Sequence, residues 1–365
     1  TYLLKAMLER ATHAKVGLIG TNQNMIGDQI LPTERTTPEA FALQSLLHQM
    51  YRQGCTHVVM EVSSHALVLH RTDTIHFRAA IFTNLTPDHL DFHRTMDQYR
   101  DAKSLLFHQC ETGIFNLDDE TGRLFAQTMP CEKFTYSENK PEADLLAENI
   151  RLCRDRVEFE ALTLNHIFRV KLPIPGGFSI YNALGVLSCG LVLGFPLAEL
   201  AQSLSNVPGV KGRVEVVPVP APFTVLIDYA HTPDALEKIL LTARDFTEKR
   251  LICLFGCGGD RDRSKRPMMG AIAAELSDLI VLTSDNPRTE PPELILDEIA
   301  AGFPANPPPI LREPNRRLAI FLALSNAQEG DVIVLAGKGH ETYQELGTQQ
   351  LPLDERVIIS EFFQQ

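Results

Sequence analysis

The sequence predicts an α/β protein in which helices cover mostly parallel sheets. Short apolar runs rich in β-branched residues alternate with stretches of helical periodicity, a rhythm typical of βαβ units. A length of 365 residues is enough for about two domains. The expected strands lie at 57–62, 79–85, 223–229, 251–256, 279–284 and 331–337.

Helices are expected in the gaps between these strands, at 38–53, 96–108, 233–246, 267–276 and 319–328. The more mixed texture of 111–171 predicts an antiparallel edge region, and 180–193 reads as a buried helix. Glycines and prolines between Lys211 and Pro222 interrupt the periodicity. We therefore expect one domain over 1–212 and a second over 213–365.

The composition of the chain argues against several classes of function. The chain has 46 acidic and 34 basic residues and a formal charge of −12, which argues against nucleic-acid or anionic-membrane binding. Its seven cysteines are scattered, so neither a disulfide framework nor a zinc knuckle is suggested, and a reducing cytoplasm fits best. No apolar run has the length of a membrane span, and no signal peptide is visible.

Polar side chains follow the two apolar runs of the first domain. Glu61, Ser63 and His65 come at the end of the first run, and Asn84 and His89 at the end of the second. Carboxylate ligands beside phosphate-binding groups suit Mg²⁺. The pair of histidines at 89 and 93 leaves zinc open as an alternative, although no third ligand has convincing spacing. Taken alone, His65 or His89 reads better as a hydrogen-bonded core or loop histidine than as a ligand.

The run LIVLTSDNPR over 279–288 delivers Asp285 and Arg288 at a strand end, where ligands bind in open parallel sheets. The Arg288 guanidinium matches a carboxylate or phosphate, and Asp285 could hold an ammonium group. Glu341, after the run at 331–337, could do the same. These charges suggest an amino-acid substrate, whereas taken alone the tetrapeptide reads as an Asx turn with a solvated arginine.

Two further clusters follow strands of the second domain. Asp228, Tyr229 and His231 lie at a strand-to-helix turn, where a nucleotide base or ribose could be held, and Thr232 is expected to cap the helix that follows. The loop 256–266 combines glycines with Arg261 and other cations that would suit phosphate. A solvated charged loop is the alternative for that segment.

Taken together, the motifs resemble the Mur ligases over essentially the whole chain. The resemblance rests on the segments TTPE (36–39), EVSSH (61–65), NLTPDHLDFH (84–93), DAKSLLF (101–107), DYAHTPDAL (228–236), FGCGGDRDRSKRP (255–267), DNPR (285–288) and AGKGHE (336–341). Within the family, the DNPR form resembles members that add meso-diaminopimelate. The resemblance to the Mur ligases implies a central ATPase-type domain followed by a Rossmann-like domain.

The resemblance implies an ATP-dependent amide ligase of peptidoglycan synthesis with ATP and Mg²⁺ as cofactors. Its implied partners are UDP-N-acetylmuramoyl-L-alanyl-D-glutamate and meso-diaminopimelate, which the enzyme would join through an acyl phosphate. The resemblance also implies that the protein is cytoplasmic and monomeric. The amine would then displace phosphate through a tetrahedral intermediate.

Site residues are carried over from the family motifs. Glu61 and His89 resemble Mg²⁺ ligands, and Lys103 resembles a carbamylated lysine that supplies a further carboxylate; these three are the expected catalytic residues. By itself, Lys103 would be read as a solvated helix residue. The implied nucleotide-sugar contacts are Thr36, Thr37, Ser63 and Arg71. The implied ATP contacts are Asn84, Asn182, Asp228, Tyr229 and His231.

The resemblance also implies a diaminopimelate pocket lined by Arg261, Asp285, Asn286, Pro287, Arg288, Gly337 and Glu341. The distal end of diaminopimelate carries an amine and a carboxylate, so Arg288 and Glu341 are complementary to it. Lysine lacks the distal carboxylate and would leave Arg288 unpaired, so its binding should be weaker by several kcal/mol.

Three departures from the family pattern stand out. The phosphate-binding loop GT-x-GK-[ST] is expected immediately before Thr1, so the sequence is expected to be an inactive fragment. Arg35 and Leu69 replace an Asn and a Gln that are common in the family. Two alternatives remain: a ligase similar to folylpolyglutamate synthase, and a non-catalytic binding protein of the same fold.

Overall fold

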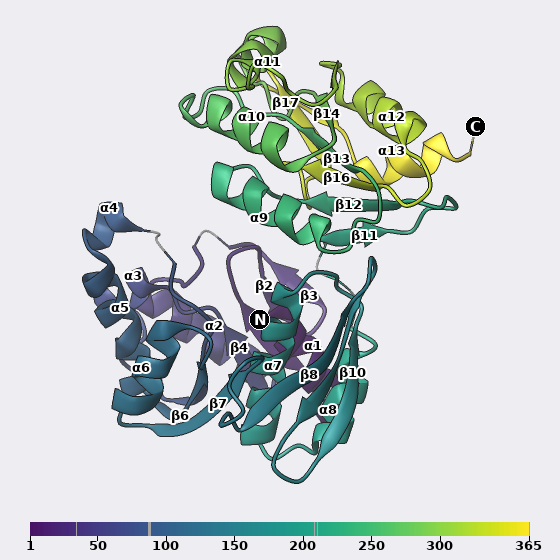
Figure 1. The fold of residues 1–365 in the computed structure, drawn as a ribbon. Helices are drawn as coiled ribbons and strands as arrows, with labels where there is room; N and C mark the ends of the chain where they lie inside the picture. The colour runs from purple at the N-terminus through teal and green to yellow at the C-terminus, as the bar shows by residue number, and fades with distance from the viewer. Residues whose placement is uncertain (34, 87–88, 208, 210, 365) are drawn as a thin grey trace. The chain divides into compact units, whose positions relative to one another are not determined.

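The computed structural model describes residues 1–33, 35–86, 89–207, 209 and 211–364 (Figure 1). The chain forms two compact units. Unit 1 comprises Thr1–Arg151, Glu158–Leu172 and Phe178–Val207, and unit 2 comprises Leu152–Val157, Pro173–Gly177 and Pro208–Gln365. Each unit has its own sheets and its own core.

Unit 1 begins with a small four-stranded sheet in the order β3-β2-β1-β4. Its elements are α1 (Tyr2–Thr12), β1 (Val16–Ile19), β2 (Asn24–Ile26), β3 (Gln29–Leu31), α2 (Ala40–Arg52) and β4 (His57–Met60). Strands β1 and β4 pair in parallel, with Val16 opposite His57. Helix α2 buries Leu43 and Met50 in a cluster with Ile19. Glu61 therefore lies at the carboxyl end of a packed parallel strand.

A six-stranded sheet in the order β10-β9-β8-β7-β6-β5 forms the rest of unit 1. Its strands are β5 (Phe77–Phe82), β6 (Cys110–Asn116), β7 (Glu132–Ser137), β8 (Leu145–Leu152), β9 (Val157–Leu162) and β10 (Ile167–Leu172). The helices are α3 (Ser64–Val68), α4 (Leu90–His93), α5 (Met96–Ser104), the 3₁₀ helix η1 (Leu105–His108), α6 (Glu120–Thr128), α7 (Phe178–Val192) and α8 (Leu197–Leu204). Helix α7 is buried along most of its length, as its apolar sequence predicts.

The prediction of antiparallel pairing over 111–171 is wrong for the first part of this segment. Strand β6 pairs in parallel with both β5 and β7, and β7 pairs in parallel with β8. For β6 and β7 the reason is α6, which is capped by Asp119 and carries the chain back between these two strands. Its short, mixed sequence did not stand out as a crossover helix. The carboxyl ends of β5, β6 and β7 consequently meet at one edge.

Unit 2 contains a six-stranded sheet in the order β11-β12-β16-β13-β14-β15, with helices packed on both faces, and a separate hairpin, β17-β18. Its strands are β11 (Glu215–Val217), β12 (Thr224–Asp228), β13 (Leu251–Phe255), β14 (Leu279–Leu282), β15 (Ile310–Arg312), β16 (Val332–Ala336), β17 (Tyr343–Leu346) and β18 (Gln349–Pro352). The helices are α9 (Pro233–Arg244), α10 (Lys265–Leu276), α11 (Pro292–Ala300), α12 (Arg316–Asn326) and α13 (Glu355–Phe362).

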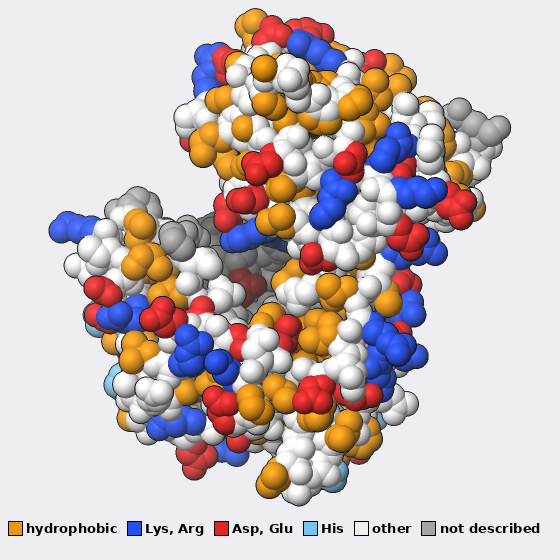
Figure 2. All heavy atoms as spheres, viewed as in Figure 1, with side chains coloured by type: hydrophobic (Ala, Val, Ile, Leu, Met, Phe, Trp, Pro, Cys, Tyr) orange, Lys and Arg blue, Asp and Glu red, His pale blue; other side chains and the backbone are white. Residues whose placement is uncertain are grey.

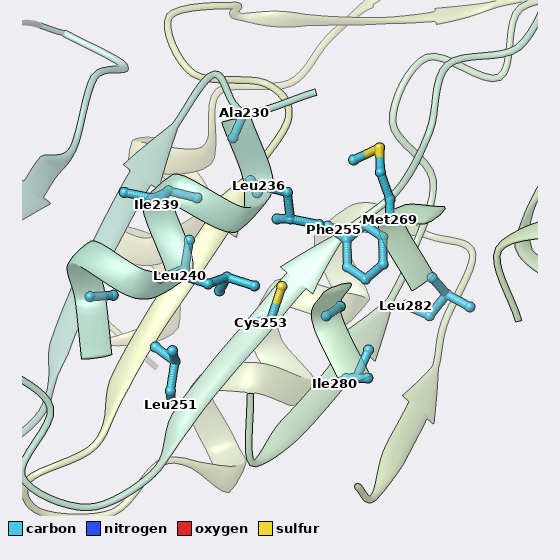
Figure 3. Packing of buried hydrophobic residues seen from close by; sticks show 14 of the residues in the cluster. Ala230, Leu236, Ile239, Leu240, Leu251, Cys253, Phe255, Met269, Ile280 and Leu282 are labelled. Carbon is cyan, nitrogen blue, oxygen red and sulfur yellow. The ribbon is translucent and has the colours of Figure 1, made fainter. Parts of the chain in front are cut away.

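Alternating side chains of the buried strands supply both faces of this sheet. Cys253 and Phe255 of β13 belong to one buried cluster with residues of α9, α10 and α11. Figure 3 shows them beside Leu236 of α9 and Met269 of α10. Ile252 and Leu254 of the same strand pack against α12 and α13. Strands buried on both faces read as continuous apolar runs, which is why the sequence revealed them. Strands β12, β16, β13, β14 and β15 are parallel to one another, whereas the edge strand β11 pairs antiparallel with β12.

The six strands expected from the sequence all form, although each is shorter than its apolar run. The expected helices form as well, and Thr232 caps α9 by accepting a hydrogen bond from the Ala235 amide at 3.3 Å. Among the described residues, no helix has the length and apolar character needed to cross a membrane. On the face drawn in Figure 2, acidic and basic side chains are interspersed with apolar ones.

Candidate active site

Glu61 is the acceptor at the carboxyl end of β4. Its Oε2 accepts the Thr21 hydroxyl at 2.5 Å and the Thr21 amide at 3.1 Å, and its Oε1 accepts the Thr1 hydroxyl at 3.0 Å. Thr36 Oγ1 lies 3.0 Å from Thr21 Oγ1. A Cβ atom on Gly20 would lie 3.1 Å from Glu61 Oε1, so glycine leaves room for the carboxylate. The arrangement places one carboxylate among hydroxyl groups.

The expected nucleotide-sugar contacts lie around the same strand end. The buried Thr37 hydroxyl donates to the Glu61 carbonyl at 2.8 Å and accepts the Ser63 amide at 3.1 Å. Ser63 caps α3. Arg71 donates to the Thr37 carbonyl at 3.1 Å and pairs with Glu39 at 2.7 Å. Thr36, Thr37, Ser63 and Arg71 are therefore brought together with Glu61.

Rings gather over α3, α4 and α5. His65 lies 4.9 Å from His89 and 5.4 Å from His93 between ring centroids. His93 is buried, stacks on Tyr99 at 5.0 Å, and has Nε2 2.8 Å from Ser64 Oγ. His93 is thus a hydrogen-bonded core histidine, which disfavours the zinc pairing. His89 is exposed and has a φ of 55°.

Lys103 is not a fully solvated helix residue, as it would be read by itself. It is partly buried on α5, and its Nζ lies 5.0 Å from the centroid of the Tyr99 ring. Within the described ranges, no group of three or more His, Cys, Asp and Glu side chains could hold a metal ion. Pro87 and Asp88 of the NLTPDHLDFH motif lie outside the described residues.

Asn84, after β5, and Asn182, on α7, are both exposed. Tyr181 beside Asn182 donates to Asp118 Oδ2 at 3.2 Å, and Asp118 also accepts the Glu138 amide at 2.7 Å. Among the residues that the structure describes, buried Glu138 Oε1 finds no hydrogen-bond partner. Burial, with the Asp118 charge as a smaller cause, raises the pKa of Glu138 to about 7.

Glu138→Gln should stabilise unit 1 at alkaline pH. A carboxyl whose pKa is raised on folding stabilises the fold below its unfolded pKa and loses that contribution as pH rises through about 7. We expect the variant to gain about 1 kcal/mol at pH 8, allowing for partial solvation, and much less at pH 5. Urea unfolding at both pH values measures this. Glu132→Gln, at an exposed position on β7, is the control, and an equal response of the two variants would contradict the assignment.

In unit 2 the loops that follow β14 and β16 come into contact at the carboxyl end of β13, the strand between them. Asp285 and Gly337 follow these strands, and a Cβ atom on Gly337 would lie 2.4 Å from Asp285 Oδ2. Gly337 has a φ of 113°, so glycine is required there for both space and conformation. A Cβ atom on Gly256, after β13, would meet the Thr283 carbonyl at 2.0 Å. Two glycines therefore allow the loops to close over the strand ends.

Asn286, Lys338 and Glu341 form a buried network beside Asp285. The Asn286 amide donates to Glu341 Oε2 at 3.0 Å. Lys338, which is fully buried, donates to Asn286 Oδ1 at 2.7 Å and to Glu341 Oε2 at 2.6 Å. Asn286 Oδ1 also accepts the Glu345 amide at 2.9 Å. One oxygen of Glu341 is thus held by protein groups, and no hydrogen bond within the described residues is recorded for Oε1.

Arg288 is held in a defined orientation. Its Nε lies 2.7 Å from Glu345 Oε2, and its Nη1 donates to the Gly259 carbonyl at 2.9 Å. Its backbone has a φ of 52°, rare for a non-glycine residue, and bonds to the Glu345 carbonyl and the Gly347 amide. A solvated arginine in an Asx turn is therefore the wrong interpretation of DNPR.

The remaining residues expected in the pocket lie against these loops. A Cβ atom on Gly258 would lie 3.0 Å from Arg288 Nη1 and 3.8 Å from Arg261 Cγ, so both arginines adjoin Gly258. Pro287 is buried, and its carbonyl would clash with any Cβ atom on Gly259. The loop 256–266 is charged and partly solvated, but its Arg266 is fully buried and donates to the Gly258 carbonyl at 3.1 Å.

Tyr229 lies between two histidines at the end of β12. Its ring centroid is 4.7 Å from that of His231 and 5.1 Å from that of His340, and the Arg213 guanidinium lies over it at 5.5 Å. Burial and then the neighbouring cations lower the pKa of His340, against the opposing effect of Glu341. Burial raises the pKa of Asp228, whose Oδ2 accepts the Val214 amide at 2.8 Å. An aromatic face with a cation suits a nucleotide base.

Several residues of this site were not singled out from the sequence. They are Arg213, Lys338, His340, Gln344 and Glu345. Lys338 and His340 stand inside the AGKGHE motif, so their position was a usable signal. Gln344 and Glu345 lie on β17, and their contacts depend on how the hairpin docks onto DNPR.

Family models match both halves of the chain. The Mur ligase middle domain matches residues 1–190, and the Mur ligase glutamate ligase domain matches residues 212–339. The chain is 46% identical over 362 residues to the UDP-N-acetylmuramoyl-L-alanyl-D-glutamate–2,6-diaminopimelate ligase of Caldanaerobacter subterraneus subsp. tengcongensis. The match spans 99% of this chain and 74% of that relative.

Solved structures agree with this similarity. A UDP-N-acetylmuramoyl-L-alanyl-D-glutamate–2,6-diaminopimelate ligase matches with 33% identity and a TM-score of 0.78, covering 100% of this chain and 76% of its own. A folylpolyglutamate synthase from Thermotoga maritima has 13% identity and a TM-score of 0.66, with coverage of 92% and 83%. The second likeness shows the fold alone.

Proposed function

Since the chain belongs to the Mur ligase family, we propose that it joins meso-diaminopimelate to UDP-N-acetylmuramoyl-L-alanyl-D-glutamate in an ATP-dependent step of peptidoglycan synthesis. The substrate assignment rests on the contact between the segments DNPR and AGKGHE, where Asn286 Nδ2 donates a hydrogen bond to Glu341 Oε2 at 3.0 Å. We propose residues 1–212 as the domain for ATP and Mg²⁺, and 213–365 as the domain for the amino acid. We place the reaction in the cytoplasm.

The pocket of unit 2 suits an amino-acid end group. Arg288 is a fixed guanidinium whose Nη2 has no recorded hydrogen bond among the described residues, and it would bind a carboxylate. Glu341 and Asp285 would bind the neighbouring ammonium group. Because Lys338 already neutralises part of Glu341, the pocket favours a group that brings both charges over a lone ammonium. Arg261, Asn286, Pro287 and Gly337 complete the proposed set.

In unit 1 we propose that Glu61 and His89, with Lys103 as its carbamate, hold Mg²⁺. The Glu61 carboxylate fits the preference of Mg²⁺ for oxygen ligands, and the hydroxyls around it suit phosphate oxygens. When bound, the ion would neutralise the crowded oxygens of the triphosphate. We propose Asn84 and Asn182 in unit 1, and Asp228, Tyr229 and His231 in unit 2, as ATP contacts.

The proposed reaction has two steps. The substrate carboxylate attacks the γ-phosphate of ATP, which forms an acyl phosphate and releases ADP. The amine of diaminopimelate then attacks the acyl carbon, and the tetrahedral intermediate expels phosphate. Thr36, Thr37, Ser63 and Arg71 would bind the nucleotide-sugar substrate, while Arg288 and Glu341 fix the distal end of diaminopimelate. Placing the amine correctly supplies much of the rate.

Substrate choice tests this proposal. In the longest form encoded by the gene, we expect turnover with meso-diaminopimelate to exceed that with L-lysine by at least about 100-fold in kcat/KM, because lysine leaves Arg288 unpaired. Phosphate release is measured with ATP, Mg²⁺ and the UDP-muramoyl dipeptide present. Omission of the dipeptide is the control for uncoupled hydrolysis. Equal or better turnover with lysine would refute the substrate assignment.

A further inference from the structure

A buried ion pair lies beneath the amino-acid pocket of unit 2. Arg316 begins α12 and Glu355 begins α13, and both side chains are completely buried. Arg316 Nε donates to Glu355 Oε1 at 2.9 Å. Burial raises the pKa of Glu355, against the opposing effect of Arg316. Burying two charges is costly, so such a pair calls for an explanation beyond stability.

The other two guanidinium nitrogens of Arg316 reach the pocket loops. Nη1 donates to the Ser284 carbonyl at 3.1 Å, and Nη2 donates to the Ala336 carbonyl at 2.9 Å. Ser284 immediately precedes Asp285, and Ala336 immediately precedes Gly337. Strands β14 and β16 are not neighbours, because β13 lies between them. One guanidinium therefore links the two strand ends that carry opposite sides of the pocket.

We propose that Arg316, oriented by Glu355, is a positioning residue that sets the spacing between the Asp285 and Gly337 loops for amino-acid binding. The identity of the ligand rests on the function proposed above. The spacing is already at its limit, since Asp285 Oδ2 occupies space that any side chain on Gly337 would fill. A small shift of either loop would alter the contact between Asp285 and Gly337.

The neighbouring residue supports the same loop. Arg356 Nη2 donates to the Gly339 carbonyl at 3.0 Å and also pairs with Glu215. The segment AGKGHE is thus held at two points, at Ala336 by Arg316 of α12 and at Gly339 by Arg356 of α13. Arginine suits the central role because its planar fork can serve three acceptors at once, whereas lysine offers a single nitrogen.

The chain supplies a matched control at the opposite end of the same strands. Arg250 pairs with Asp331 at 2.6 Å, and the Asp331 side chain is completely buried. These residues immediately precede β13 and β16. Replacing Arg250, whose own side chain is 37% exposed, takes the partner from a buried carboxylate of the same sheet, on the side away from the pocket. Effects that follow only from lost stability should be shared by both sites.

The experiment compares Arg316→Lys and Arg316→Met with Arg250→Lys and Arg250→Met in the same chain. Amide hydrogen exchange without ligand is measured over 283–288 and 336–341, together with the Kd for meso-diaminopimelate and the Tm. We expect Arg316→Lys to raise exchange in both loops and to weaken binding about 10-fold or more, because binding groups must stay closely placed. The Arg250 variants should lower the Tm while the Kd changes less than about twofold.

The two possible failures are separable. If Arg316→Lys leaves exchange in both loops and the Kd unchanged, or if Arg250→Lys changes them equally, the positioning role is overturned. If the unaltered protein prefers lysine to diaminopimelate, the proposed function fails, but the exchange comparison still decides the role of Arg316. Retained binding by Arg316→Lys with lost binding by Arg316→Met would also count against the inference, since one nitrogen would then suffice.

Discussion

Arg288→Ala should raise the Kd for meso-diaminopimelate about 100-fold, equivalent to about 2.7 kcal/mol, while that for ATP changes less than about twofold. The side chain is mostly buried and is held by Glu345 and the Gly259 carbonyl, so its orientation is fixed before the ligand arrives. Its loss removes recognition of the distal carboxylate. Calorimetric titration with each ligand measures the two effects.

Arg312→Ala is the matched control for Arg288. Arg312 pairs with Glu293 and Asp297 at the surface of the same unit. Its removal should leave both dissociation constants unchanged, because exposed pairs contribute little. Equal losses for diaminopimelate and ATP in Arg288→Ala would show that the substitution disturbs unit 2 as a whole, and would count against the pocket assignment.

The strand ends of unit 2 could be predicted because two local signals coincide there. Apolar runs mark strands buried on both faces, and polar tetrapeptides mark where they stop. Asp285, Arg288 and Glu341 were found in this way, and the structure brings their loops together. The parallel pairing of β6 with β7 was missed because one short helix decides it.

Supporting residues could not be found from local pattern. Lysine is rarely buried, so the complete burial of Lys338 follows only from its long-range partners Asn286 and Glu341. Glu345 meets Arg288 because the β17-β18 hairpin docks beside DNPR. Arg316 and Glu355 are separated by 39 residues, and no sequence period connects them.

Unit 1 shows the same limit. The threonines and Arg71 expected near the nucleotide-sugar lie within hydrogen-bonding networks around Glu61. The grouping of Glu61 with His89 and Lys103 came from the family motif, and it stays a prediction about the bound state. Glu61 follows β4, His89 precedes α4 and Lys103 lies on α5, so no local spacing relates the three side chains.

Glu61→Gln should lower kcat about 100- to 1,000-fold while the Kd for diaminopimelate changes less than about twofold, since only an electrostatic group near the transferred phosphoryl is altered. The amide keeps one oxygen that can accept the Thr21 hydroxyl and amide, as Oε2 does, while its NH₂ group can donate to the Thr1 hydroxyl, and the negative charge is lost. The Mg²⁺ concentration for half-maximal rate should rise in the same variant. Turnover across an Mg²⁺ titration, in the longest form encoded by the gene, measures both effects.

Glu111→Gln is the control for this prediction, because Glu111 pairs with Arg78 at an exposed site on β6. It removes the same charge from unit 1 away from β4, so general electrostatic effects should appear in both variants. A loss confined to Glu61→Gln, with an unchanged Tm, supports a direct role in phosphoryl transfer. An unchanged Mg²⁺ requirement in Glu61→Gln would remove Glu61 from the proposed metal ligands and leave it as a structural acceptor for the Thr21 loop.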